Sequence, residues 1–144
     1  MRKIFILVIA TILLFVSVGC GRKQNKIVCT LDDGLYKQKI TLFYEGAEVT
    51  KFVSKEVYPV DPSEATKEVT DTLKFFTDYN GNVDGFEVSV KAINGSTLIQ
   101  VDIVHNYDVF DFEAYLSGTR LSKDDFVNLE IRREFFENKD FKCK

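Results

Sequence analysis

Apolar and polar side chains alternate along five segments of the chain, with the two-residue period of a half-buried strand. The alternation is strict in residues 86–93 and ambiguous in residues 48–58, which are rich in β-branched and aromatic side chains. The other three segments are residues 26–31, 36–44 and 96–105. Turn-forming residues separate consecutive strands at Asp32-Asp33-Gly34, Glu45-Gly46 and Asn94-Gly95. Such tight turns predict antiparallel pairing.

Two longer segments carry apolar residues at helical spacing. Asp61, Pro62 and Glu64 form a helix start before the first, and Asn80-Gly81 indicates its end. Its apolar stripe is Ala65, Val69, Leu73 and Phe76. The second helix is expected from Ser122 to about Asn138, with the stripe Phe126, Leu129, Arg133 and Phe136. A short helix ending near Gly118 is expected in the aromatic and acidic segment before it.

This order of elements predicts an α+β fold rather than a doubly wound one. We expect an antiparallel sheet of about five strands, with two main helices packed on one face. Residues 27–144 are enough for one compact domain and hardly enough for two.

The N-terminal residues have the pattern of an export signal. Arg2 and Lys3 precede fifteen uncharged, mostly apolar residues at 4–18, a run short for a membrane-spanning helix. Residues 1–19 are therefore predicted to be a signal peptide. An ordinary cleaved signal or an uncleaved anchor are the alternatives.

Ser17, Val18, Gly19 and Cys20 resemble the lipobox of bacterial lipoproteins, although Ser17 replaces the usual leucine. The resemblance implies cleavage before Cys20 and acylation of Cys20, with palmitate as an expected chain. Residues 20–26 would then be a lipidated tether, holding the domain on the extracytoplasmic face of the cell membrane.

The net charge of the chain limits the classes of partner that we expect it to bind. The formal net charge is −3, and removal of Arg2 and Lys3 makes it −5. A mildly acidic domain lacks the basic footprint of a nucleic-acid-binding protein. The membrane, reached through the lipid on Cys20, and an envelope protein are the partners that we expect.

Two cysteines, Cys29 and Cys143, remain near opposite ends of the domain once Cys20 is assigned to lipidation. Outside the cytoplasm they could form a disulfide, or they could stay as two buried free thiols. Together with one histidine they make a poor zinc site, and we expect no cofactor.

Several features together resemble the YehR-like family of bacterial lipoproteins, whose domain has no assigned function. They are the lipobox cysteine, the segment KIVCTL at 26–31, the strands to residue 58, the helix after Val60, the strands at 86–105 and the ending FKCK at 141–144. The resemblance implies a small α+β lipoprotein domain with Cys29 and Cys143 as a candidate pair. It implies no reaction.

Three places could hold chemistry, and each also has a purely structural interpretation. The sole histidine, His105, would be needed by any Ser-His or Cys-His mechanism, but it ends a predicted strand. Oxygen ligands alternate at Asp78, Asn80, Asn82 and Asp84, although the spacing of a calcium loop is wrong beyond them. A ligand surface could form from Tyr107, Asp108, Asp111 and Glu113, where acids lie among aromatic residues.

The remaining charged residues have simpler roles. Asp124 and Asp125 suit the start of the last helix, and Arg132 and Arg133 are expected on its solvated face. The sequence therefore favours a non-enzymatic binding or interaction module on the membrane. An accessory lipoprotein that binds a small molecule or metal for a transporter is the alternative, and a cell-envelope hydrolase is a third.

Overall fold

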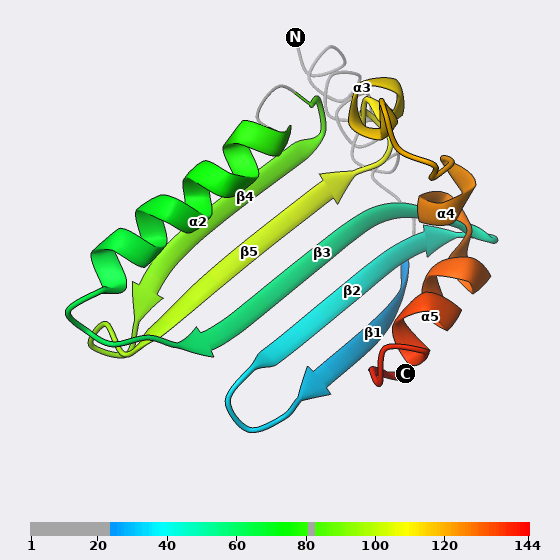
Figure 1. Ribbon diagram of the computed structural model, residues 1–144. Coiled ribbons are helices and arrows are strands. Elements are labelled where there is room, and N and C mark those ends of the chain that lie inside the picture. The colour runs from blue at the N-terminus through cyan, green and yellow to red at the C-terminus, as the bar shows by residue number, and fades with distance from the viewer. Residues whose placement is uncertain (1–23, 81–82) are drawn as a thin grey trace, which may run out of the picture.

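The computed structural model describes residues 24–80 and 83–144, so the lipobox and Cys20 lie outside the described residues. One six-stranded antiparallel sheet has the order β4-β5-β3-β2-β1-β6 (Figure 1). The strands are β1 (Asn25–Asp32), β2 (Lys37–Glu45), β3 (Glu48–Pro59), β4 (Phe86–Ile93), β5 (Leu98–Asn106) and β6 (Lys142–Cys143). The helices are α2 (Ala65–Asn80), α3 (Phe112–Leu116), α4 (Asp124–Val127) and α5 (Leu129–Glu137). None of the helices in the described part of the chain is long and apolar enough to cross a membrane.

The α+β prediction is confirmed, with one strand more than the pattern indicated. The five predicted strands form and pair with their neighbours, and the β4–β5 hairpin turns at Asn94 and Gly95, both at positive φ. The sixth strand, β6, pairs Cys143 with Cys29 and Lys142 with Thr30. Two residues are too few to show a periodic pattern, which is why the sequence did not predict it.

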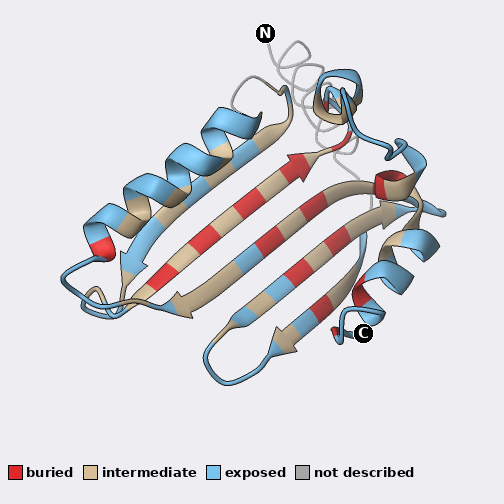
Figure 2. Ribbon diagram, in the orientation of Figure 1, coloured by how far each residue is buried: buried red, intermediate tan, exposed pale blue. Residues whose placement is uncertain are grey.

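Both main helices cover the same face of the sheet, as predicted. Buried and less buried residues alternate along β5 and β3 (Figure 2), and the buried set includes Phe52, Ser54, Ile103 and His105. Helix α2 lies over β4 and β5 (Figure 1), while α4 contacts β3 and α5 contacts β6. The covered face therefore has a helical wall on each side.

The predicted C-terminal helix is wrong as a single helix, because Asn128 divides it into α4 and α5. Asn128 has extended backbone angles and forms an isolated bridge with Glu48. The next residue, Leu129, donates its backbone N–H to the Ala47 carbonyl at 3.0 Å. A tertiary contact with the β2–β3 turn thus interrupts the helix, and the Asn128 side chain caps α5.

The interruption changes which residues of α5 face the sheet. Arg133, predicted in the apolar stripe, is exposed and pairs with Glu137 at 2.8 Å. Arg132, predicted on the solvated face, instead packs among phenylalanine rings above the sheet. The solvated face that the sequence predicts is therefore wrong for Arg132 and correct for Arg133, which is not part of the apolar stripe.

Cys29 and Cys143 form a disulfide, across 114 residues of sequence. The bond joins two directly paired strand residues, and Val28 and Lys144 exchange backbone hydrogen bonds of 2.9 Å beside it. The Cys29 side chain is fully buried. Of the alternatives that the sequence left open, free thiols are excluded and the bridge is observed.

Candidate functional site

A groove runs between the two helical walls on the covered face of the sheet. Its inner chamber has a volume of about 280 Å³ and lies directly on the strands. Its outer chamber, of about 460 Å³, lies between α2 and the segment from α3 to α4. The two chambers share the lining residues Phe76, Asn80, Tyr115 and Phe126. We call the two chambers together the inter-helix groove.

The floor of the inner chamber contains a polar patch. The Gln38 side chain donates to Ser54 Oγ at 3.0 Å and to Glu56 Oε1 at 2.6 Å. Gln38 and Glu56 are cross-strand partners, and Ser54 is the preceding inward residue of β3. Burial raises the pKa of Glu56, while its hydrogen bonds to Tyr36 and Ser54 act in the opposite direction. This end of the groove therefore presents a carboxyl group that already has partners.

His105 lies in the floor next to Phe52 and Phe86, its partners on β3 and β4. Its side chain is only 7% exposed, and its ring centroid is 5.0 Å from that of Phe110. Its Nδ1 atom is buried without a hydrogen-bond partner among the described residues. Burial, reinforced by the charge of Arg132, lowers the pKa of His105 to about 4. His105 is thus neutral at physiological pH.

Arg132 carries a positive charge into the same chamber. Its guanidinium carbon is 4.8 Å from the centroid of Phe136, and it lies 5.3–5.5 Å from three further rings. Those rings belong to Phe52, Phe126 and Phe135. No carboxylate in the described ranges 24–80 and 83–144 forms a salt bridge with Arg132, and its Nε atom is buried without a hydrogen-bond partner.

Arg132 is half-buried and has no salt bridge in the described chain, although the charge of Asp125 acts on it. Burial lowers the pKa of Arg132, although a guanidinium remains charged at physiological pH. Removing such a charge from water costs several kcal/mol. Cation–π contacts return about 2 kcal/mol when they are desolvated. The remaining cost is the reason that buried cations in proteins are usually paired with an anion.

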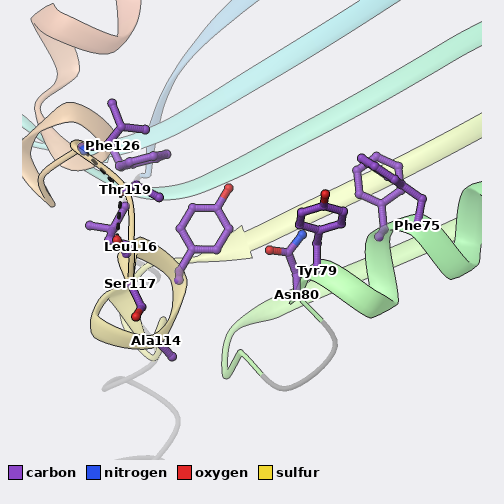
Figure 3. Close-up of a pocket in the computed structure, with 11 residues that line it drawn as sticks. Phe75, Tyr79, Asn80, Ala114, Leu116, Ser117, Thr119 and Phe126 are labelled. Atoms are coloured by element: carbon purple, nitrogen blue, oxygen red, sulfur yellow. Dashed lines mark hydrogen bonds between the residues drawn. The ribbon is translucent and has the colours of Figure 1, made fainter.

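Large apolar side chains line the outer chamber while remaining open to solvent. Tyr79 is 75% exposed, Phe75 56% and Leu121 55%, and all three line this chamber. Figure 3 shows Phe75, Tyr79 and Asn80 on α2, facing Ala114, Leu116 and Ser117 across the gap. Contiguous exposed apolar side chains at a concave surface mark a contact site.

The predicted ligand surface at 107–113 is divided between core and solvent. Tyr107 is buried against Phe110 and Phe112, and its hydroxyl has no hydrogen-bond partner in the described chain. Burial raises the pKa of Tyr107 to about 12. Asp108, Asp111 and Glu113 are exposed, and Asp111 caps α3 through Ala114 N at 2.9 Å. The acids and the Tyr107 ring therefore do not share one surface.

The other predicted positions have structural roles. Asp78 pairs with Lys74, Asp84 accepts a backbone bond from Asp111 through its carbonyl, and Asn82 lies outside the described residues. Nowhere in residues 24–80 and 83–144 do three or more His, Cys, Asp or Glu side chains gather as a metal site. The Asp125 carboxylate accepts hydrogen bonds from Ser122 N at 2.6 Å and Oγ at 2.9 Å. Asp124 starts α4, as predicted.

Sequence reasoning singled out His105 but missed Ser54, Glu56 and Arg132, which line the same chamber. Ser54 and Glu56 follow Phe52 at two-residue steps, so strict alternation in β3 would have placed all three inward. No sequence signal distinguishes Arg132 from Arg133, because the phase of α5 is set by the contact of Asn128 and Leu129 with the β2–β3 turn.

Comparisons with known proteins bear on the fold. The NMR structure of the Escherichia coli YehR protein matches with a TM-score of 0.66 and 19% identity, covering 85% of this chain and 92% of that one. The NMR structure of a protein from Streptococcus pneumoniae TIGR4 matches with a TM-score of 0.58 and 14% identity, covering 86% and 87%. No family model matches the chain, and no curated protein matches it in sequence. The chain therefore has a YehR-like fold.

Proposed function

We propose that this protein is a lipid-anchored extracytoplasmic binding module of the YehR-like lipoproteins, with the inter-helix groove as its ligand site. The observation that carries the binding role is the groove itself. It is concave, its walls are aromatic, and the buried side chains of Ser54 and His105 and the half-buried side chain of Arg132 converge on one chamber. Ligand sites of proteins have this combination of an apolar lining and a few placed polar groups.

The proposed location is supported by the sequence and by the disulfide. The apolar N-terminal run and Cys20 have the pattern of a lipoprotein signal. The Cys29–Cys143 bond supports this location, because disulfides persist mainly in oxidising compartments outside the cytoplasm. A tether of a few residues would then hold the groove close to the membrane surface.

The non-enzymatic role is supported by the surroundings of His105. The ring packs against aromatic side chains, and no hydrogen bond joins it to a hydroxyl, thiol or carboxylate of the described residues. A nucleophile–base pair needs such a hydrogen bond. Without one, binding is the chemistry that the groove supports best.

Binding in the groove can be tested with N-phenyl-1-naphthylamine, a neutral fluorophore that brightens in apolar sites. We expect saturable fluorescence with the wild-type domain, and a loss of about tenfold or more in affinity for Asn80→Trp. Asn80 lines both chambers, so an indole there fills the groove. Thr70→Trp on the exposed side of α2 is the matched control and should bind as the wild type does. No saturable signal, or equal binding by Asn80→Trp, would remove the groove from consideration.

The anchor can be tested independently in the full chain expressed in a bacterium. We expect the mature N-terminal peptide to begin at Cys20 and to carry a diacylglyceryl mass. Cys20→Ala should move the protein from the membrane to the soluble fraction. An unacylated N-terminus at any position, with unchanged membrane association in Cys20→Ala, would reject lipidation.

A further inference from the structure

We propose that the ligand of the inter-helix groove is a small amphipathic acid, whose anionic group binds Arg132 and whose apolar body lies in the outer chamber. This inference rests on the proposed binding function and specifies its ligand class. It follows from three features: a half-buried cation without a salt bridge in the described structure, the position of the one acid in the groove lining, and the exposed apolar walls.

The cation is the first feature. The Arg132 side chain extends from α5 into the inner chamber, where four phenyl rings surround it and no carboxylate pairs with it in the described structure. Its buried Nε–H has no acceptor. A carboxylate or phosphate oxygen supplies both the charge and the acceptor that this group lacks.

The distribution of charge in the groove fixes the direction of the ligand. Glu56 is the acidic residue that lines the inner chamber, and it lies four residues along β3 from Phe52, the floor residue under Arg132. At about 3.3 Å per strand residue, Glu56 lies roughly 13 Å along the chamber from Phe52 and therefore from the end that holds Arg132. Glu56 already accepts a hydrogen bond from Gln38. An anion is therefore favoured at the Arg132 end and repelled from the Glu56 end.

The apolar walls of the groove indicate that the rest of the ligand is apolar. Phe126 and Tyr115 line both chambers, so an apolar group can pass from the Arg132 end into the outer chamber without leaving aromatic contact. There it meets Phe75, Tyr79 and Leu121, which are otherwise exposed (Figure 3). The chamber volumes of about 280 and 460 Å³ suit a ligand of drug size rather than a simple inorganic anion.

The head group can be tested with a matched pair of fluorophores. 1-Anilinonaphthalene-8-sulfonate has the ring system of N-phenyl-1-naphthylamine plus one anionic group. We expect the wild-type domain to prefer the sulfonate, and Arg132→Met to lower the ratio of the two affinities by about tenfold or more, as for a lost charge-assisted hydrogen bond. Arg132→Lys, which keeps the charge but not the planar fork, should retain part of the preference.

Arg133→Met is the control, because Arg133 lies beside Arg132 in sequence but is exposed and paired with Glu137. It should leave the ratio unchanged. An unchanged ratio in Arg132→Met, with both fluorophores bound and near-ultraviolet dichroism preserved, would overturn the proposal that the ligand is an acid. The groove would then remain a binding site without that specificity. If neither fluorophore binds the wild type, the binding function itself fails.

Competition experiments test whether the ligand has an apolar chain and whether it is a soluble acid or a membrane lipid. Octanoate should displace the sulfonate fluorophore at least about tenfold more strongly than 1-octanol, which lacks the charge, or acetate, which lacks the chain. Equal displacement by acetate would reduce the site to a simple anion site. Displacement by phosphatidylglycerol vesicles but not by octanoate would replace the soluble acid with a membrane lipid, and would also overturn the proposal.

Discussion

His105 makes the stability of this domain sensitive to acid. Its pKa is about 4 in the folded state, against about 6.5 in an unfolded chain. Between these two values the unfolded state binds the proton and the folded state does not, so the free energy of unfolding falls as the pH falls. We expect a loss of roughly 3 kcal/mol from this residue between pH 6.5 and pH 4, measured by urea unfolding.

The matched variant is His105→Gln, which cannot titrate. Its unfolding free energy should change less over the same range, and the difference between the two proteins isolates His105. Glu56 acts in the opposite direction, because its raised pKa makes protonation favour the folded state, but it is common to both proteins and cancels. Parallel pH profiles would show that His105 is not buried as described.

We expect Arg132 to contribute more to the affinity for the ligand than to the free energy of unfolding. We expect Arg132→Met to leave the free energy of unfolding within about 1 kcal/mol of wild type or to raise it, because the apolar side chain loses cation–π energy but no longer buries a charge. Thermal and urea unfolding measure this. A loss of about 3 kcal/mol would instead indicate that Arg132 is paired in the folded protein.

These single residues mark the limit of what the sequence could predict. The Cys29–Cys143 pair followed from the number of cysteines and a family resemblance, because few alternatives existed. Arg132 and Arg133 are adjacent and chemically identical, and only the three-dimensional position of Leu129 against Ala47 decides which one is buried. Where a contact distant in sequence determines the burial of a side chain, the local pattern of apolar residues cannot predict that burial.

At the level of elements, the approach of two loops requires glycine at position 85. Gly85 has φ of +79°, and its carbonyl accepts from Asn106 N at 2.8 Å. A Cβ there would lie 2.6 Å from the Asn106 carbonyl oxygen and 3.0 Å from the backbone of Phe110. These are main-chain atoms, so the contact cannot be relieved by a side-chain rotation. The loop that supports Phe110 against His105 would have to move.

We expect Gly85→Ala to destabilise the domain by about 2 kcal/mol or more, since it combines left-handed strain with a backbone clash. Gly95→Ala is the matched control, because Gly95 has φ of +65° with nothing near its Cβ position. It should cost only about 1–2 kcal/mol, the left-handed penalty alone. Equal losses in urea unfolding would contradict the close packing at Gly85.

Elements were predictable where local sequence determines them. The start of α2 after Asp61 has the expected cap, with Asp61 accepting from Ser63 at 2.8 Å, and the hairpin at Asn94-Gly95 turns where its residues predict. The break at Asn128 and the two-residue strand β6 depend on partners eighty or more residues away in sequence. Both features are stabilised by tertiary contacts, and no short stretch of the sequence contains both partners of such a contact.

Over the whole molecule, the groove depends on holding two walls at a fixed separation over the sheet. The wall that carries Arg132 is attached at both ends. At its start, Leu129 bonds to Ala47, and after its end, Phe141 packs on Phe136 with ring centroids 5.4 Å apart. The disulfide then ties Cys143 to β1. Global stability and local positioning of Arg132 are therefore carried by separate contacts.

The double variant Cys29→Ala/Cys143→Ala tests this separation. Closing a chain of this length lowers the entropy of the unfolded state by an amount worth about 4–5 kcal/mol, so we expect the melting temperature to fall by more than about 10 °C. Because the Leu129–Ala47 bond remains, the affinity for 1-anilinonaphthalene-8-sulfonate at 15 °C should fall less than about threefold. If the affinity instead collapses while the domain is still folded, then the disulfide, rather than the β2–β3 turn, determines where Arg132 lies.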